Sequence, residues 1–145
     1  MLTKKLMGAG GLGAAAAGVE FIAVTTDSTP YVHAYEWTDA GGFGTKFSDP
    51  SSPPASAPAS INLSPSADSI GIGRGDATYG ITVWPWSTSG FGTKFSTPAA
   101  ITSTAGTGLA WSVAGTEIVT TGGATYAYPW SGSGFGTRFT NPTSP

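Results

Sequence analysis

The chain contains no cysteine, and only 10% of its 145 residues are charged. Without cysteine it can form no disulfide bond and no thiolate metal site, and it has no thiol nucleophile. The charged fraction lies far below the roughly 25% that is usual in soluble domains. Six basic residues stand against eight acidic ones, so there is no basic stripe to neutralise phosphates. Nucleic acid is therefore not an expected partner.

Residues for chemistry are also scarce. His33 is the single histidine, and neither a nucleophile-elbow serine nor a carboxylate at a supporting spacing accompanies it in the sequence. The acidic residues are scattered, and none forms a calcium-loop pattern. We expect no enzyme, no metal and no cofactor, and we expect His33 to be a packing residue of a strand. The catalytic alternative is a pair of carboxylates for glycoside hydrolysis.

Two short patterns have simple explanations. Arg74-Gly75-Asp76 matches an integrin-type tripeptide, but so short a match arises often by chance. The glycines at 71, 73 and 75 superficially suggest a phosphate loop, yet no lysine or helical pattern follows them. Both patterns are expected to belong to a glycine-rich turn between strands.

Residues 1–18 differ from the rest and form a Gly/Ala-rich N-terminal arm. Lys4 and Lys5 precede the apolar run 6–19, which has the outline of a secretory signal peptide. The glycines in the run make it a poor helix former, and it is too short and too weakly apolar to cross a membrane. We expect a flexible or partner-ordered arm and no membrane contact. A cleaved signal peptide, with secretion of the protein, is the alternative.

Glycine, proline and aromatic residues are plentiful: the chain has 22 glycines, 11 prolines and 12% aromatic residues. They recur in three copies of one motif. It reads GFGTKFSDP at 42–50, GFGTKFSTP at 90–98 and GFGTRFTNP at 134–142. A tryptophan, Trp37, Trp86 or Trp130, precedes the motif by a few residues in each copy. Such a fixed repeat dictates the architecture of the whole chain.

Read with a period of two, the recurring elements of each copy are predicted to be strands. Three elements occur in every copy, ending in the motif itself, and a fourth, at 61–64 and 109–112, occurs in the last two copies only. Alternation places His33, Tyr35 and Trp37 on one face, and it places Phe43 and Phe47 together on one packed face with Lys46 in water. The polar segments at 38–42, 87–90 and 131–134 are expected to be hairpin turns in which glycine supplies a positive φ.

Four short strands per repeat and a proline-bearing connector are typical of a propeller blade. We therefore predict an all-β chain of three tandem four-stranded blades, the first of them incomplete. Their expected bounds are 19–50, 51–98 and 99–145. The aromatic residues expected to form the repeat cores are Trp37, Phe43, Phe47, Trp84, Trp86, Phe91, Phe95, Trp130, Phe135 and Phe139.

The motif GFGT(K/R)F followed by proline, with Trp84-Pro85-Trp86 and Tyr128-Pro129-Trp130 upstream, resembles WD40-like β-propeller repeats of tailed bacteriophages. The resemblance covers roughly residues 18–145. It implies a virion protein, such as a capsid decoration or tail-associated protein. The first copy lacks its first strand, and the Trp-Asp dipeptide typical of WD40 repeats is absent.

Three blades cannot close a ring by themselves, and bare end faces are poorly soluble. We expect the chain to associate with itself, two copies giving six blades or three giving nine, or to pack on another virion protein. A compact three-blade prism or a short stack is the alternative architecture. The tryptophans also suggest a second function, a glycan-binding adhesin for host attachment, because exposed aromatic rings stack on sugars.

Overall fold

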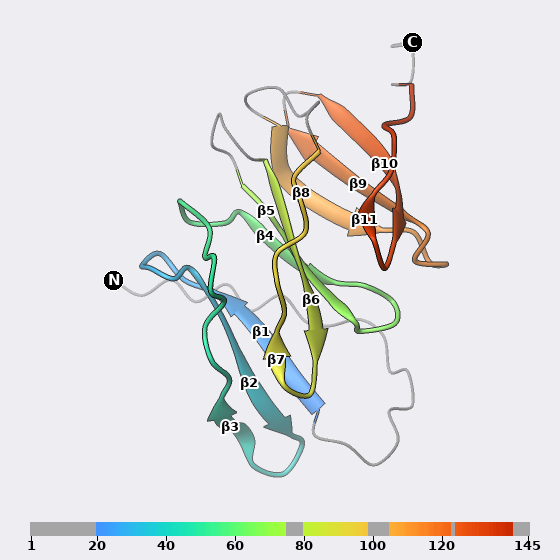
Figure 1. Ribbon diagram of the computed structural model, residues 1–145. Helices are drawn as coiled ribbons and strands as arrows, with labels where there is room; N and C mark the ends of the chain where they lie inside the picture. Colours follow the sequence, from blue (N-terminus) through green and yellow to red (C-terminus); the bar gives the residue numbers. More distant parts are fainter. Residues whose placement is uncertain (1–19, 75–79, 99–104, 123, 141–145) are drawn as a thin grey trace.

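The computed structural model describes residues 20–74, 80–98, 105–122 and 124–140. Within these ranges the chain is all-β and contains no helix. Its eleven strands form three antiparallel sheets. The prediction of the all-β class is confirmed. The sheets follow one another along the chain, from blue through green to orange (Figure 1). We call the segments 19–50, 51–98 and 99–145 the first, second and third units.

The first unit contributes a sheet of three strands in the order β1-β2-β3. The strands are β1 (Glu20–Thr25), β2 (Val32–Thr38) and β3 (Gly42–Lys46). The arm at 1–18, in the place where the other two units have their first strand, lies outside the described residues. The prediction that the first copy lacks its first strand concerns this stretch and stays a prediction.

The other two units each form a sheet of four strands, in the orders β4-β5-β6-β7 and β11-β10-β9-β8. The strands of the second unit are β4 (Ser60–Leu63), β5 (Ser69–Gly73), β6 (Ile81–Ser87) and β7 (Gly90–Phe91). Those of the third unit are β8 (Ala105–Trp111), β9 (Glu117–Gly122), β10 (Thr125–Ser131) and β11 (Gly134–Phe135). In each sheet, neighbours along the chain are neighbours in space.

The predicted hairpin turns before the phenylalanine motif are confirmed. Gly42, Gly90 and Gly134 have φ values of 71°, 98° and 105°. A side chain is strained in this left-handed region, whereas glycine adopts it freely. The first glycine of each motif therefore reverses the chain so that the motif runs back along the tryptophan strand.

A second turn recurs between the first two strands of the second and third units. The backbone N–H of Ser64 donates to the carbonyl of Ser69, and the N–H of Ser69 donates in return to Ser64 Oγ. Ser112 makes the same pair of bonds with Glu117. Such serine side chains favour turns because they satisfy backbone groups locally. The chain thereby enters the second strand of each unit in the same register.

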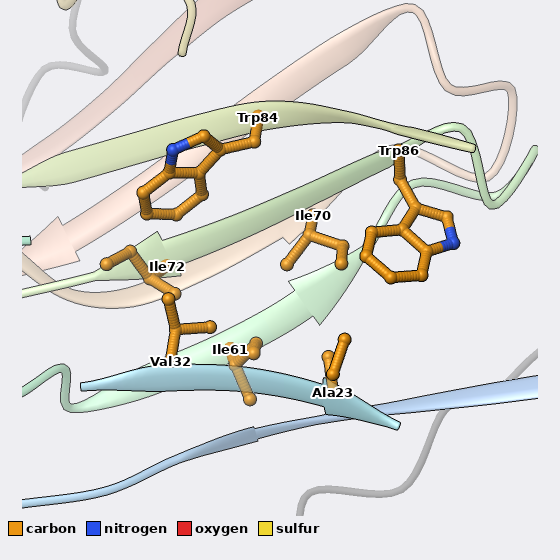
Figure 2. Packing of buried hydrophobic residues seen from close by; sticks show 8 residues of the cluster. Ala23, Val32, Ile61, Ile70, Ile72, Trp84 and Trp86 are labelled. Atoms are coloured by element: carbon orange, nitrogen blue, oxygen red, sulfur yellow. The ribbon is translucent and has the colours of Figure 1, made fainter. Parts of the chain in front are cut away.

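The middle sheet is covered on both sides. One of its faces carries Ile70, Ile72, Trp84 and Trp86, which pack against the first sheet. Figure 2 shows these side chains pointing toward Val32 and Ala23 of the first unit. All of the residues in this cluster are at most 7% exposed. The first core of the molecule therefore lies between the first and second sheets.

The opposite face of the middle sheet packs against the third unit. Ile81 and Val83 of β6, both fully buried, contact a cluster from the third sheet that includes Ile118, Tyr128 and Trp130. Gly71 is required here, because a Cβ at this position would lie 2.5 Å from the ring of Trp111. The second core therefore lies between the second and third sheets.

The prediction that Phe43 and Phe47 share a face is wrong. Trp37 pairs with Phe43 and Tyr35 pairs with Lys46, so the third strand contains one extra residue at this point. Because side chains alternate with a period of two, one inserted residue sends the following side chains to the other face. Phe43 therefore lies beside Trp37 of its own unit, whereas Phe47 packs against the second unit.

The paired part of the motif is also shorter than expected in the last two units, where β7 and β11 have two residues each. Beyond them the chain stays bound to the tryptophan strand by isolated hydrogen bonds. The N–H of Phe95 donates to the carbonyl of Val83, and the N–H of Phe139 donates to that of Ala127. The equivalent bond in the first unit joins Phe47 to Ala34.

Candidate functional site

One contact between neighbouring units recurs at both junctions, and at the first junction the ring of Phe21 also packs on Trp86, with centroids 4.4 Å apart. The ring of Phe47 packs edge-to-face on Trp86, with centroids 4.9 Å apart, and Phe95 packs on Trp130 at 5.0 Å. Each tryptophan also holds the first phenylalanine of its own motif, at 5.1 Å for Phe91 and 4.9 Å for Phe135. The tryptophan of one unit is thus the receptor for the last phenylalanine of the unit before it.

The turn glycine completes this receptor. A Cβ on Gly90 would lie 3.7 Å from Phe47, and a Cβ on Gly134 would lie 3.2 Å from Phe95. Both glycines are buried, whereas Gly42 of the first unit is only half-buried. The second unit and the third unit therefore each present a tryptophan and a bare backbone on which a phenylalanine ring rests.

The second glycine of each motif permits close packing within the unit. A Cβ on Gly92 would lie 3.1 Å from Pro85, and a Cβ on Gly136 would lie 3.0 Å from Pro129. The N–H groups of these glycines donate to the carbonyls of the same prolines. Each residue of the motif GFGT(K/R)F that recurs in these contacts therefore has its own role. The first glycine forms the turn, and the first phenylalanine packs on the tryptophan of its own unit. The second glycine allows the close approach to proline, and the last phenylalanine packs on the next unit.

The first unit carries the same receptor without an occupant among the described residues. Its outward face is bordered by the exposed Glu20, which pairs with Trp37. The rest of this face, here called the open aromatic face, consists of Ile22, Val24, His33, Tyr35, Trp37 and Phe43. The ring of Phe43 lies 5.3 Å from Trp37 and is 53% exposed, and the other five side chains are half-buried. The equivalent positions in the second unit, such as Ile70 and Trp84, are 0% exposed.

The third unit carries the complementary part at the other end. Phe139 holds the position of Phe47 and Phe95, including the backbone bond to the tryptophan strand, yet it is 46% exposed. Val119 and Ala127, which pair with one another, alternate with the buried Tyr126 and Tyr128 and so lie on the outward side of their sheet. Val119, Ala127, Pro129 and Phe139 are here called the open knob face, which is bordered by Glu117, the partner of Pro129 in the neighbouring strand.

A charged group borders the open aromatic face, and the sequence analysis missed it. His33 Nδ1 lies 2.9 Å from the carboxylate of Asp49, and Lys46 Nζ lies 2.8 Å from the same carboxylate. Burial raises the pKa of Asp49, but the hydrogen bonds from Lys46 and His33 outweigh it and hold the pKa below its usual value. Asp49 lies sixteen positions after His33. The only signal of this pairing in the sequence is the aspartate in the Ser48-Asp49-Pro50 end of the motif.

The basic residue of each motif is exposed, as expected, but its surroundings differ from unit to unit. Lys46 binds Asp49, whereas the guanidinium of Arg138 lies over the ring of Tyr126 at 5.1 Å. Lys94 is exposed as well. These three positions therefore share their orientation toward water and do not share a binding partner.

Arg74 is only 2% exposed, with its backbone N–H bonded to the carbonyl of Gly80. An adhesive tripeptide needs an accessible arginine, so the burial of Arg74 argues against that interpretation. The other two residues of the tripeptide, Gly75 and Asp76, lie outside the described residues.

The aromatic residues predicted as repeat cores fall into three groups by burial. Trp84, Trp86 and Trp130 are buried. A second group, half-buried at the junctions and on the open aromatic face, consists of Trp37, Phe47, Phe91, Phe95 and Phe135. Phe43 and Phe139 are exposed and are not core residues, because in the described chain no neighbouring unit covers them.

No group of three or more His, Asp or Glu residues gathers in the described ranges in a way that could hold a metal ion. In the same ranges no helical segment has the length and hydropathy to span a bilayer.

No family model matches the chain, and no curated protein matches its sequence.

Proposed function

We propose that the chain is a non-enzymatic structural protein of a bacteriophage particle, either a capsid decoration or a tail-associated protein. Its three units act as propeller-like blades that stack through their faces and bind further protein through the faces left open at the ends. The repeat motif, which resembles that of phage propeller repeats, supports the virion setting. The stacking of successive sheets supports the comparison with blades.

One observation carries the proposal. The open aromatic face repeats, position by position, a surface that the preceding unit buries in the second and third units. Trp86 and Trp130 are each 7% exposed, whereas Trp37 has no ring from another unit against it in the described residues. Fully burying an aromatic side chain is worth on the order of 2 to 3 kcal/mol, so such a face favours contact with protein.

The test is recovery from particles. Purified particles of the phage that encodes the chain should contain it in a fixed number of copies per particle. Val24→Lys places a charge in the open aromatic face and should abolish incorporation of the chain, while the solution structure is retained. Val113→Lys is the matched control, because Val113 is 98% exposed and belongs to neither open face. Absence of the wild-type chain from particles would contradict the virion assignment.

A second function, a glycan-binding adhesin, is favoured by the same incompletely covered rings. Tyr35, Trp37 and Phe43 lie together, with 5.4 Å between the centroids of Tyr35 and Phe43. Adjacent aromatic rings of this kind offer a platform for a sugar. Binding of the wild-type chain to a glycan array, lost in Trp37→Ala, would favour this function over assembly.

A further inference from the structure

We infer that the open knob face of one chain binds the open aromatic face of a second copy of the same chain, head to tail, in the geometry of the two internal junctions. This inference rests on the proposed assembly function and names its partner. The internal junctions are the template for this contact. At each junction, a surface equivalent to the open knob face packs on a surface equivalent to the open aromatic face.

The apolar parts of the two surfaces match in chemistry as well as in position. At each internal junction, small or β-branched residues and the last phenylalanine of the motif meet a face of aromatic and branched aliphatic residues, and at the first junction Phe21 joins them. The surface with small or β-branched residues includes Ala34 and Phe47 at the first junction, and it includes Val83 and Phe95 at the second. The open knob face, with Ala127 and Phe139, is a surface of the same kind. The open aromatic face, with Tyr35 and Trp37, corresponds to the surface of aromatic and branched aliphatic residues.

The receptor on the first unit is formed without its phenylalanine. Gly42 has φ 71°, like its counterparts Gly90 and Gly134, and Phe43 already packs on Trp37 at 89° between ring planes. A Cβ on Gly42 would meet only the ring of Trp37, at 3.9 Å, whereas Gly90 and Gly134 have a phenylalanine from the preceding unit above them. Among the repeated phenylalanines of the described chain, only Phe139 packs on no tryptophan. Phe139 of a second copy is therefore the ring that we assign to this receptor.

The contact is heterologous, since the two surfaces are different, so it either closes into a ring or continues into a filament. This property gives a sharp test. Phe139→Ala removes the knob and leaves the receptor, whereas Trp37→Ala removes part of the receptor and leaves the knob. Each variant alone should lose self-association, with the dissociation constant raised about 30-fold or more, as for an aromatic hot-spot residue.

Mixing the two variants should restore one interface. The intact receptor of the Phe139→Ala chain and the intact knob of the Trp37→Ala chain form a pair that cannot grow further. Native mass spectrometry or light scattering should therefore find wild-type assemblies of two or more chains, single chains for each variant, and one-to-one pairs in the mixture. Val24→Lys serves as a second receptor variant should Trp37→Ala disturb the first sheet, and Val113→Lys should assemble like wild type.

Several outcomes overturn the inference. A wild-type chain that stays single at all concentrations, a mixture that forms no pairs, or variants that assemble as well as wild type would each do so. If deletion of 1–18 is needed before the chain associates, the arm is the natural occupant of the open aromatic face and the inference fails. A single-chain protein that is still recovered in particles would leave the proposed function standing with another partner.

Discussion

The ring of Phe95 stands nearly perpendicular to the indole of Trp130, at 81° and 5.0 Å between centroids, although Phe95 follows β7 of the second sheet and Trp130 lies in β10 of the third. Phe47 and Trp86 have the same relationship at the first junction, at 79° and 4.9 Å. One phenylalanine of each motif therefore joins its unit to the next, and its exposed equivalent at the end of the described chain is Phe139.

Phe95→Ala and Phe139→Ala should differ strongly in stability, although the two residues hold equivalent positions. Phe95→Ala should lower the free energy of unfolding by about 3 kcal/mol, because it leaves a cavity against Trp130. Phe139→Ala should lower it by less than about 1 kcal/mol, because Phe139 is largely exposed. Urea denaturation at a concentration where the chains are single measures both. Equal losses would show that Phe139 is already covered within its own chain.

Phe91→Ala should cost about 3 kcal/mol of unfolding free energy. The ring of Phe91 packs on both Trp84 and Trp86, at 5.9 and 5.1 Å, and belongs to the first core. Phe43→Ala at the equivalent position of the first unit is the control and should cost less than about 1 kcal/mol. A loss below about 1 kcal/mol for Phe91→Ala would contradict its place in the core.

Gly134→Ala should destabilise the protein by about 1 to 3 kcal/mol, because the new Cβ meets the ring of Phe95 and φ of +105° strains any side chain. Gly132→Ala, two residues earlier in the same turn, has nothing within 4 Å of its Cβ and should change stability by no more than about 0.5 kcal/mol. Thermal or urea unfolding of the pair gives the comparison. Similar values for the two variants would refute the role assigned to the turn glycine.

Ala67→Gly should stabilise the protein. Ala67 has φ of 55°, where the equivalent turn of the third unit has Gly115 at 73°. Relief of the left-handed strain, about 1 to 2 kcal/mol, exceeds the added chain entropy of glycine, about 0.5 to 1 kcal/mol. We expect a gain of about 0.5 kcal/mol in urea denaturation. Ala114→Gly, beside the glycine of the other turn, should lower stability instead, and a loss for Ala67→Gly would disprove the strain.

The turn at Asp68 should make stability depend on acid pH. Burial raises the pKa of Asp68, but the hydroxyl groups of Ser64, Ser66 and Ser69 donate to the carboxylate and hold the net pKa below its usual value. A lowered pKa in the folded state contributes stability above the unfolded pKa of about 3.9 and loses it as pH falls through the folded pKa.

Asp68→Asn should therefore be less stable than wild type at pH 7 and should lose less of its stability on acidification below about pH 4. Ser64→Ala removes one donor to the same carboxylate and should flatten the pH dependence in part. Urea midpoints measured from pH 7 down to pH 2 test both variants. A parallel pH dependence for wild type and Asp68→Asn would rule out this carboxylate as the source.

The amino-acid sequence alone determined the all-β class, the position of nearly every strand and the three glycine turns. These features are local: the period of two, the glycine before each phenylalanine and the proline after it act over a few residues of chain. Gly42, Gly90 and Gly134 could be placed in left-handed turns for this reason.

Only the tertiary structure decided which face each phenylalanine takes and which residues remain uncovered. One extra residue between Phe43 and Lys46 sends Phe47 to the second unit, and no pattern of hydropathy reveals so small a shift in register. The pairing of His33 with Asp49, the burial of Arg74 and the exposure of Phe139 likewise depend on residues distant along the chain. Packing between sheets is set by such long-range contacts, and these form only when the sheets stack.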